Sequence, residues 1–350
     1  MSRRVYILLV NWNGWADTLE CLESLLCLDY PDFRVVVVDN ASTDDSCDYI
    51  HNWVNNRFDV WQTGPRSTPS NPTSGRSFTF AEYEREEAEE GGDRSRDEFL
   101  TVVRSAENLG FAGGNNVGLR FALARGDAGF VWLLNNDTVV DKSALTAMVT
   151  RIQAKPGTGM CGSTLLFFAR PEIVQSLGGG YYCPWFAVAW HLGQRRAFVP
   201  TKDPARVERH LSYIVGASML VSMEWVREIG LMTEDYFLYF EEVDWTLRAG
   251  KRFSLAYAPA SLVYHKVGGS IGTRSHPAHK SLVCDYYNLR NRLIFTRRFY
   301  PWALPTVLLG LGIEALVRIG CGRMSRAMMI FRLMANWRNP PTLTSIERAV

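Results

Sequence analysis

The stretch FVWLLNNDTVVDKSAL, residues 130–145, passes from an apolar run to three polar residues and then to a helix-like segment. Its apolar half, 130–134, predicts a buried strand. Asn135, Asn136 and Asp137 end that strand abruptly. Asn and Asp tolerate tight backbone conformations, so a simple turn would explain them. A ligand site is the alternative, and the ends of the other expected strands distinguish the two explanations.

The N-terminal third of the chain alternates strand and helix patterns. Apolar, β-branched runs at 5–10, 33–39 and 99–105 predict strands, while residues 16–28 and about 115–125 show helical spacing. Strands that alternate with helices predict a mostly parallel α/β sheet. Ligands of such sheets bind beyond the carboxyl ends of the strands.

Polar clusters follow several of the expected strands. Four of the strands end in such clusters, which are Asn11-Trp12-Asn13, Asp39-Asn40, Glu107-Asn108 and Asn135-Asn136-Asp137. A turn explains one polar strand end. Four of them at one edge of a sheet favour a binding crevice instead.

The composition is that of a folded protein with a large core. Of the 350 residues, 47% are hydrophobic and 21% are charged, and the formal net charge is +2. A nearly balanced charge argues against a general nucleic-acid binder, so we expect no nucleic-acid partner. The seven cysteines are scattered and include no C-x-x-C pair. They predict thiols in a reducing compartment rather than a disulfide framework or a zinc site.

Residues 64–98 interrupt the alternating pattern with a segment rich in Pro, Ser and Gly and then in Glu. Such a composition buries too little apolar surface to order itself. We therefore interpret 64–98 as a mobile insertion between two strands of the sheet. Its acidic half, Glu82 to Glu90, is compatible with a solvated helix.

The C-terminal region 291–350 is expected to be helical and to follow a main domain at 1–290. Its uncharged run 300–313 spans 14 residues, which is shorter than the roughly 18 to 20 residues of a membrane-spanning helix. Glu314 and Arg318 interrupt the continuation of this run. With its basic flanks, the region suits an element lying on a membrane surface. It equally suits a helical pair packed on the protein, and the sequence leaves both interpretations open.

Asp137 and His265 are candidate metal ligands. Asp137 ends one expected strand, with the amide of Asn135 two residues before it, and such groups bind divalent cations that also hold phosphate oxygens. His265 ends another expected strand and offers a nitrogen ligand for manganese. A lone histidine is more commonly structural, but beside Asp137 it would be a second ligand of Mg²⁺ or Mn²⁺. Gly269 and Ser270 then offer an N–H group and a hydroxyl to a phosphate.

Glu241, Glu242 and Asp244 form a carboxylate cluster flanked by Phe240 and Trp245. A carboxylate beside apolar rings has a raised pKa, which suits a general base near neutral pH. On a helix, Glu241 and Asp244 would share one face at i and i+3, and Glu242 would point elsewhere. The cluster equally suits a helix N-terminus, which favours acidic side chains. Both interpretations are open.

The glycine-rich stretch ENLGFAGGNNVGL, residues 107–119, precedes an expected helix. It lacks the G-x-G-x-x-G spacing after the first strand, and the chain contains no GKS or GKT. Dinucleotide-binding and P-loop sites are therefore disfavoured. Gly113 and Gly114 are expected to let the backbone approach a sugar or phosphate closely.

Seven motifs occur in the order found in family 2 glycosyltransferases, namely VNWNG (10–14), VVVDNASTDDS (36–46), ENLGFAGGNNVGL (107–119), LLNNDTVV (133–140), GASML (216–220), FLYFEEVDWTLRA (237–249) and YHKVGGSIG (264–272). The sequence most resembles the rhamnosyltransferase branch, whose members build bacterial cell-surface polysaccharides. The resemblance covers about residues 5–300 apart from 64–98. It implies a GT-A type α/β fold, which is Rossmann-like with a mostly parallel central sheet flanked by helices, here followed by a helical C-terminal extension.

The resemblance also implies roles for individual residues. Asp137 would bind the metal, with Asn135 in place of the first acid of the family's D-x-D motif, and His265 would help to bind the metal or the diphosphate. Glu242 would be the base, because it stands where the family has the second acid of a Glu-Asp pair. Glu241 and Asp244 are the further candidates. The expected nucleotide-sugar-binding residues are Val10, Asn11, Asn13, Asp39, Ser42, Asn108, Gly113, Gly114, Asn115, Asn135, Asn136, Gly269 and Ser270.

The implied reaction is an inverting transfer from a nucleotide-diphosphate sugar, with dTDP-L-rhamnose as the first expectation. The acceptor would be a polysaccharide or a lipid-linked glycan. The enzyme would work in the cytoplasm, at the inner face of the cell membrane. A sugar-phosphate nucleotidyltransferase is one alternative, but it needs a basic phosphate loop near the first strand, and VNWNGWADT (10–18) has no Lys or Arg. A non-catalytic scaffold is a second alternative. A scaffold would not need Asp137, His265 and the carboxylates of residues 241–244, and all of these are present.

Overall fold

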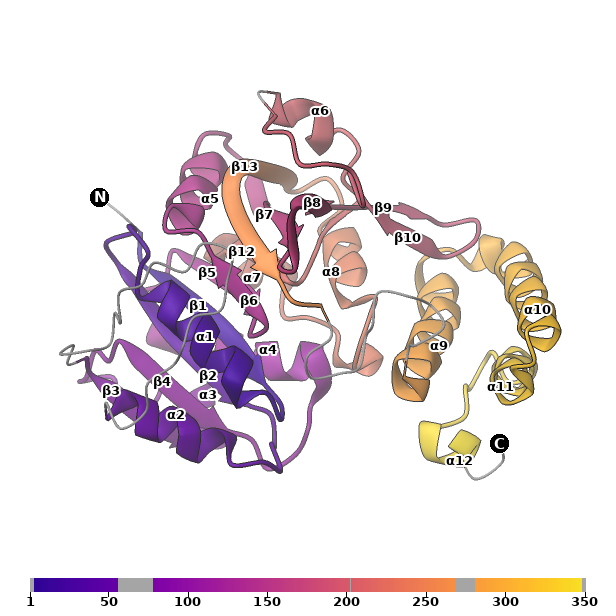
Figure 1. The fold of residues 1–350 in the computed structure, drawn as a ribbon, viewed down its shortest axis with the longest axis horizontal. Coiled ribbons are helices and arrows are strands. Elements are labelled where there is room, and N and C mark those ends of the chain that lie inside the picture. The colour runs from indigo at the N-terminus through magenta and orange to yellow at the C-terminus, as the bar shows by residue number, and fades with distance from the viewer. Residues whose placement is uncertain (1–2, 56–77, 202, 268–280, 348–350) are drawn as a thin grey trace.

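The computed structural model of the chain describes residues 3–55, 78–201, 203–267 and 281–347. A central sheet is flanked by helices, and the C-terminal helices lie together at one end of the molecule (Figure 1). The candidate residues Gly269 and Ser270 lie outside the described residues.

The large sheet is mixed, with its N-terminal strands all parallel. Its order is β3-β4-β2-β1-β5-β12-β7-β13-β6, and β8 pairs with β7. β12 runs antiparallel to both β5 and β7. The strands are β1 (Val5–Asn11), β2 (Phe33–Asp39), β3 (Phe80–Glu84), β4 (Leu100–Arg104), β5 (Phe130–Asn135), β6 (Thr138–Val140), β7 (Thr158–Phe167), β8 (Arg170–Leu177), β12 (Ser218–Ser222) and β13 (Ser254–His265), with β9 (Gly179–Cys183), β10 (Val188–His191) and β11 (Tyr213–Ile214) in a small second sheet. The expected mostly parallel α/β sheet is confirmed.

The helices and short 3-10 turns follow the same chain order. They are α1 (Trp15–Leu25), α2 (Ser46–Val54), α3 (Arg85–Glu89), α4 (Gly110–Arg125), α5 (Ala144–Gln153), α6 (Pro204–Glu208), α7 (Met223–Ile229), η1 (Glu234–Tyr236), α8 (Glu241–Ala249), α9 (Leu282–Phe299), η3 (Pro301–Ala303), α10 (Leu304–Gly320), α11 (Met324–Ala335) and α12 (Leu343–Glu347). The expected helical C-terminal region is therefore confirmed.

Successive residues of β1 face opposite sides of the sheet and build a core on each side. Val5, Ile7 and Leu9 pack in the core that contains α1, α2 and α5. Tyr6 and Leu8 pack in the core that contains α4 and α7. Because side chains alternate along a strand, a run that is apolar throughout must be covered on both faces. Helices on both faces thus hold the carboxyl ends of β1, β2 and β5 at one edge.

Residues 78–98 are ordered, contrary to the mobile insertion expected over 64–98. β3 pairs in parallel with β4 at the outer edge of the sheet, and α3 follows it. Ala81 and Tyr83 are buried, whereas Glu82 and Glu84 alternate with them. The glutamates occupy the outward positions, so the strand needs few apolar residues to pack. The rest of the expected insertion, 64–77, lies outside the described residues.

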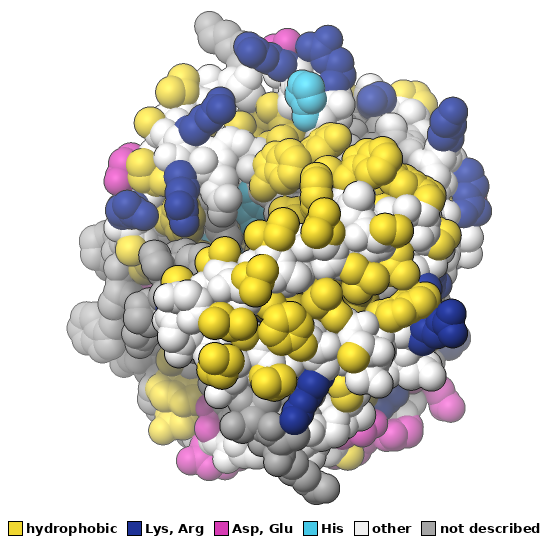
Figure 2. Space-filling view, turned by 90° about the vertical axis from the view of Figure 1, so that its right-hand side faces the viewer, with side chains coloured by type: hydrophobic (Ala, Val, Ile, Leu, Met, Phe, Trp, Pro, Cys, Tyr) yellow, Lys and Arg dark blue, Asp and Glu magenta, His cyan; other side chains and the backbone are white. Residues whose placement is uncertain are grey.

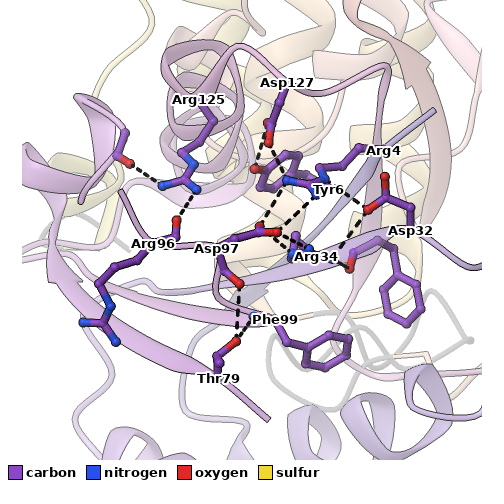
Figure 3. Close-up of polar contacts among 12 residues, drawn as sticks. Arg4, Tyr6, Asp32, Arg34, Thr79, Arg96, Asp97, Phe99, Arg125 and Asp127 are labelled. Atoms are coloured by element: carbon purple, nitrogen blue, oxygen red, sulfur yellow. Dashed lines mark hydrogen bonds and ion pairs between the residues drawn. The ribbon is translucent and has the colours of Figure 1, made fainter. Parts of the chain in front are cut away.

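A cluster of ion pairs fastens the segment before β4 to the sheet (Figure 3). Asp97 accepts hydrogen bonds from Arg34 Nε at 2.8 Å and from Arg4 Nη1 at 3.1 Å. Arg4 also donates to Asp127, just before β5, at 2.6 Å. The groups are partly exposed, so each pair alone contributes little stability. Their shared contacts join the N-terminal ends of β4, β2, β1 and β5.

Replacement of residues 66–96 by a short Gly/Ser linker is expected to destabilise the protein, because it removes β3 and α3. Ala81, Tyr83 and Ala88 are buried there, and burial of one large side chain contributes about 1.5–3 kcal/mol. Urea denaturation is expected to show a loss of about 3 kcal/mol or more in the free energy of unfolding. A linker that replaces only 66–76 is the control. Equal stability of the two variants would show that β3 does not support the fold.

Helix α9 crosses the domain boundary expected at residue 290. Its residue Asn291 is buried and donates hydrogen bonds to backbone carbonyls of the segment before α8. α9 is therefore packed into the main domain rather than placed outside it. The following helix α10 is also longer than expected, because it continues through Glu314 and Arg318 to Gly320.

Candidate active site

The carboxyl ends of β1 and β2 carry a hydrogen-bonded polar cluster. Asn11 Nδ2 donates to Asp39 Oδ1 at 2.8 Å, and Ser42 Oγ donates to the same oxygen at 2.6 Å. The Ser42 N–H donates to the second oxygen, Oδ2, at 3.1 Å. Asn11 and Asp39 meet because they are register partners of the parallel strands. The structure thus brings together three predicted site residues and holds the Asp39 carboxylate in one orientation.

Asn13 joins the loops that follow β1 and β2. Its φ of 50° lies in the left-handed region, which Asn adopts more readily than most residues. Its Oδ1 accepts from the N–H groups of Thr43 at 2.7 Å and Asp44 at 3.2 Å. Its own N–H donates to Ser42 Oγ at 2.9 Å. Asn13 therefore shapes the rim of the predicted nucleotide site.

Asn136 connects the end of β5 to β1 through a residue that the sequence analysis did not identify. Asn136 Nδ2 donates to Thr18 Oγ1 at 2.9 Å, and Thr18 Oγ1 donates to Asn11 Oδ1 at 2.8 Å. All three residues are buried. Thr18 lies in the first turns of α1, and its hydroxyl completes the network.

Asp137 and His265, the two predicted metal ligands, lie side by side. Asp137 Oδ1 is 3.0 Å from His265 Nε2, and Asn135 Nδ2 is 3.4 Å from the same nitrogen. β13 pairs antiparallel with β6, and this pairing places His265 opposite Thr138. The residues come from strands far apart in the sequence and meet only through the sheet.

Gln175 on β8 orients His265. Gln175 is buried, and its Oε1 lies 2.9 Å from His265 Nδ1. An amide oxygen can only accept, so Nδ1 carries the proton in this contact, and in the neutral ring the lone pair of Nε2 then faces Asp137. Gln175 was not predicted from the sequence, because no motif around it signals this role.

Asn108 and Asn115 are turned toward the protein. Asn40 Nδ2 donates to Asn108 Oδ1 at 3.0 Å, and the same oxygen accepts from the N–H of Gly110 at 2.9 Å. Asn115 is buried and donates to the carbonyl of Phe111 at 2.9 Å. These amides fix the entry into α4.

Gly113 and Gly114 lie inside α4 rather than in a loop, because the helix begins at Gly110 and not near residue 115. A Cβ on Gly114 would lie 2.8 Å from Val10 Cγ1, and one on Gly113 would lie 2.6 Å from Leu109 Cβ. Gly114 therefore allows α4 to pack closely on β1, whereas Gly113 makes room for Leu109 at the start of the same helix. Both glycines thus have a packing role, and the expected approach to a sugar or phosphate stays a prediction.

Glu242 lies at the start of α8, close to the end of β5. Its Oε1 accepts from the N–H of Gly216 at 3.1 Å. The adjacent carbonyl of Ala217 accepts from the N–H of Asn135 at 3.1 Å. A Cβ on Gly216 would lie 2.7 Å from Glu242 Oε1, so a larger residue there would displace the carboxylate from this contact. Desolvation raises the pKa of Glu242, which nevertheless remains partly exposed.

Glu241 is more deeply buried than its neighbour, with 1% of its surface exposed. Within the described chain, neither of its carboxyl oxygens has a hydrogen-bond partner. Burial, and then the charge of Glu242, raise the pKa of Glu241 well above its ordinary value. A raised pKa favours the protonated acid at neutral pH. Of the pair, Glu242 is therefore the better candidate for an ionised base.

Asp244 has a structural role, which corrects its place among the candidate bases. The residue is 0% exposed. Its carboxylate accepts from Thr233 Oγ1 at 2.9 Å, Tyr236 OH at 2.9 Å and Arg248 Nε at 2.7 Å, and Arg298 Nη1 lies 3.1 Å away. The carboxylate thus joins η1, α8 and α9 in the interior.

The backbone directly before α8 is strained. Phe237, Tyr239 and Phe240 have φ values of 64°, 71° and 80°. Left-handed conformations of such residues cost about 1–3 kcal/mol each and persist only where neighbours hold them. Asn291 Nδ2 donates to the carbonyls of Leu238 at 2.8 Å and Tyr239 at 3.0 Å. Helix α9 therefore braces the segment that presents the Glu241-Glu242 pair.

Known proteins with similar folds are glycosyltransferases. The solved mannosyltransferase PcManGT from Pyrobaculum calidifontis, in complex with GDP-Man and Mn²⁺, aligns with a TM-score of 0.51 and 16% identity over 100% of this chain and 86% of that chain. GalNAc-T7 with UDP, GalNAc and Mn²⁺ aligns with a TM-score of 0.50 and 13% identity over 82% of this chain and 47% of that chain. At these identities the similarity concerns the fold, and it confirms the expected GT-A type.

Sequence comparison points the same way. The low-salt glycan biosynthesis hexosyltransferase Agl10 of Haloferax volcanii is 26% identical over 153 residues, which are 43% of this chain and 46% of that protein. The match therefore spans less than half of the relative. Residues 6–63 and 82–229 match the model of the family described as glycosyl transferase family 2. Because these two ranges cover more than half of the chain, the protein belongs to glycosyl transferase family 2.

Proposed function

We propose that the protein is an inverting, metal-dependent glycosyltransferase that uses a nucleotide-diphosphate sugar. Its acceptor is a polysaccharide or a lipid-linked glycan of the cell surface, and it works in the cytoplasm at the inner face of the cell membrane. The observation that carries the proposal is the Asp137–His265 pair, 3.0 Å apart, at the same sheet edge as the Asn11–Asp39 cluster. Family membership supports the reaction class.

The Asp137–His265 pair fits a divalent cation. The lone pair of Nε2 and a carboxylate oxygen 3.0 Å apart repel each other unless a proton or a cation lies with them. Two ligands at about 2.1–2.2 Å from one octahedral ion lie about 3 Å apart. The described residues contain no group of three or more His, Cys, Asp or Glu side chains that could hold a metal ion, so other ligands, such as diphosphate oxygens, would complete the shell. The bound cation would neutralise the leaving diphosphate as a Lewis acid.

The remaining residues bind the donor and move the proton. The fixed carboxylate of Asp39, with Asn11 and Ser42, offers hydrogen bonds to a nucleotide base or ribose. Glu242 accepts the proton of the acceptor hydroxyl while that oxygen attacks the anomeric carbon, and the nucleoside diphosphate leaves from the opposite face. One displacement inverts the anomeric centre and needs no enzyme nucleophile.

L-Rhamnose from dTDP-rhamnose is the donor we favour, on the motifs shared with the rhamnosyltransferase branch. Structurally similar proteins are solved with GDP-Man, or with UDP and GalNAc. The test is a panel of dTDP-, GDP- and UDP-sugars, each with and without EDTA. Transfer from dTDP-rhamnose that stops with EDTA is expected. Metal-independent transfer would overturn the metal assignment, and pyrophosphate release from a nucleoside triphosphate and a sugar phosphate would indicate a nucleotidyltransferase.

Gln175→Leu is expected to weaken Mn²⁺ binding about 10- to 100-fold, because the loss of a hydrogen bond that orients a ligating histidine has effects of this size. Titration calorimetry with Mn²⁺ and a nucleoside diphosphate measures the change without turnover. Gln175→Glu keeps an oxygen for His265 Nδ1 and should retain most of the affinity. Gln194→Leu, at an exposed glutamine, is the control. Unchanged Mn²⁺ affinity in Gln175→Leu would contradict the orienting role.

A further inference from the structure

The hydrophobic side chains on the surface are gathered on one part of the molecule. Within the described chain, 13 of the 14 exposed large hydrophobic residues lie at 181–190 or 302–331. We call them the outer apolar face, and they are Tyr181, Trp185, Phe186, Val188, Trp190, Trp302, Leu309, Ile313, Leu316, Val317, Met324, Met328 and Phe331. Figure 2 shows a broad hydrophobic patch on this side, with Lys and Arg around its margin. A soluble monomer seldom exposes so extended an apolar patch without a use for it.

The β9–β10 hairpin and helix α10 form one continuous surface. The rings of Trp185 and Trp302 meet edge to face with centroids 4.6 Å apart. Thr306 Oγ1 donates to the carbonyl of Trp185. On the hairpin, Tyr181 and Trp190 are paired across the strands with centroids 4.9 Å apart. The hairpin therefore extends the face of α10 rather than forming a separate patch.

Helix α10 is amphipathic, but its apolar side chains face outward and its charged side chains face the protein. Leu309, Ile313 and Leu316 recur at helical spacing and are 63%, 55% and 64% exposed. The charged residues of the helix point inward instead. Arg318 donates to both carboxylate oxygens of Asp285 on α9, at 2.7 and 2.9 Å. A helix that faced water would place its charged side chains outward, so the outer side of α10 is suited to an apolar environment.

The elements that carry the outer apolar face are strongly basic. Residues 179–191 and 300–341 contain five arginines, no lysine and one acidic residue, Glu314. Glu314 is engaged by Arg292 and Arg318. Arg318 and Arg326 are bound to Asp285 of α9. The arginines that remain to meet headgroups are Arg323, Arg332 and Arg338. A basic, apolar and tryptophan-bearing surface matches an anionic lipid interface, where arginines meet headgroups and tryptophans lie at the boundary.

A second copy of the chain fits this face less well. A two-fold interface brings the same patch of both subunits together. It would set the arginines of one copy against those of the other, with Glu314 as the single acid on each side.

A membrane-spanning helix also fits less well. Residues 301–320 are long and apolar enough to cross a membrane by length and composition, but the ion pairs with α9 hold them along the protein.

We propose that the outer apolar face seats the protein on an anionic lipid surface, with α10 and α11 lying in the plane of the membrane. The β9–β10 hairpin contributes its aromatic side chains to the same contact. The outer apolar face would be the surface that holds the protein at the inner face of the cell membrane, the location proposed above. It is independent of the proposed transfer reaction, because it needs neither donor nor acceptor.

Vesicle flotation of the full chain tests the proposal. The probes are vesicles of phosphatidylcholine alone and vesicles that also contain about 30% phosphatidylglycerol. The wild type is expected to float with the anionic vesicles. Leu309→Gln, Ile313→Gln and Leu316→Gln combined are expected to lower the partition coefficient at least about tenfold, because each removes apolar area from the contact. Val199→Gln is the matched control, since Val199 is 74% exposed but lies beyond the face.

Two further measurements separate the possible outcomes. Arg323→Glu with Arg338→Glu should reduce binding to the anionic vesicles more than to the neutral ones. Thermal melting checks that the exposed substitutions leave the fold intact. Absence of wild-type flotation with either vesicle, or equal flotation of the triple variant, would overturn the proposal. A wild-type dimer in sedimentation that the triple variant converts to a monomer would assign the face to a second copy instead.

Discussion

Asp137→Ala is expected to abolish transfer, with a loss in kcat of at least about 10²-fold, since a Lewis acid at the leaving group contributes several kcal/mol. Asp137 Oδ1 and His265 Nε2 lie 3.0 Å apart, and the carboxylate is the ligand of the pair that supplies negative charge. The same change should weaken Mn²⁺-dependent binding of a nucleoside diphosphate in calorimetry. Binding without metal should change little.

Two companion variants make this result interpretable. Asp137→Asn keeps the shape of the buried side chain and removes its charge, so it should reproduce the loss if the charge matters. Asp203→Ala removes an exposed aspartate elsewhere and should leave turnover near wild type. Mn²⁺-dependent diphosphate binding that is unchanged in Asp137→Ala would remove this residue from the metal site.

Glu242→Gln is expected to lower kcat by a factor of about 10² or more while donor affinity stays near wild type. The substitution keeps the volume of the side chain and the contact with the Gly216 N–H while it removes the proton acceptor. Desolvation raises the pKa of Glu242, so the base ionises at a higher pH than an ordinary glutamate. The acid limb of kcat should therefore lie above the ordinary glutamate range, with kcat falling as the pH drops through it. In Glu242→Gln that limb should disappear.

The neighbouring acids provide the comparison for Glu242. Glu241→Gln should cost less activity, because its raised pKa already keeps the acid largely protonated at neutral pH. Asp244→Asn should chiefly lower stability, because the carboxylate is held by three hydrogen bonds and an ion pair in the interior. Near-normal kcat in Glu242→Gln together with collapse in Glu241→Gln would move the base to Glu241 and leave the transferase proposal standing.

The strand ends were predictable because a buried strand leaves a local signal. The apolar runs that end in Asn11, Asp39 and Asn135 fix both the strands and the edge where their polar residues meet. His265 was also predictable, since it ends a strand. Gln175 was not, because its role arises only when β8 pairs beside β7 and brings it to His265. Such contacts depend on tertiary structure and leave no local pattern.

The start of α4 and the strand β3 differ from their predicted structure for the same physical reason. Gly113 and Gly114 have low helix propensity, yet both lie in α4, where Gly114 meets Val10 and Gly113 meets Leu109 too closely for a Cβ. β3 lies in a segment rich in charge, yet the alternation of Ala81 and Tyr83 with outward glutamates is enough for an edge strand. In both places tertiary contacts override the average preference of the local composition.

Helix α9 connects the outer apolar face to the backbone that carries Glu242. Asn291 on α9 bonds to the carbonyls of the segment before α8, and Asp285 on the same helix binds Arg318 of α10. A shift of α10 on a lipid surface would therefore reach the segment before α8 through this one helix. Thermodynamic linkage makes such coupling reciprocal. If lipid changes the affinity for the sugar nucleotide by some factor, the sugar nucleotide changes the affinity for lipid by the same factor, and the membrane then acts as an effector of the enzyme.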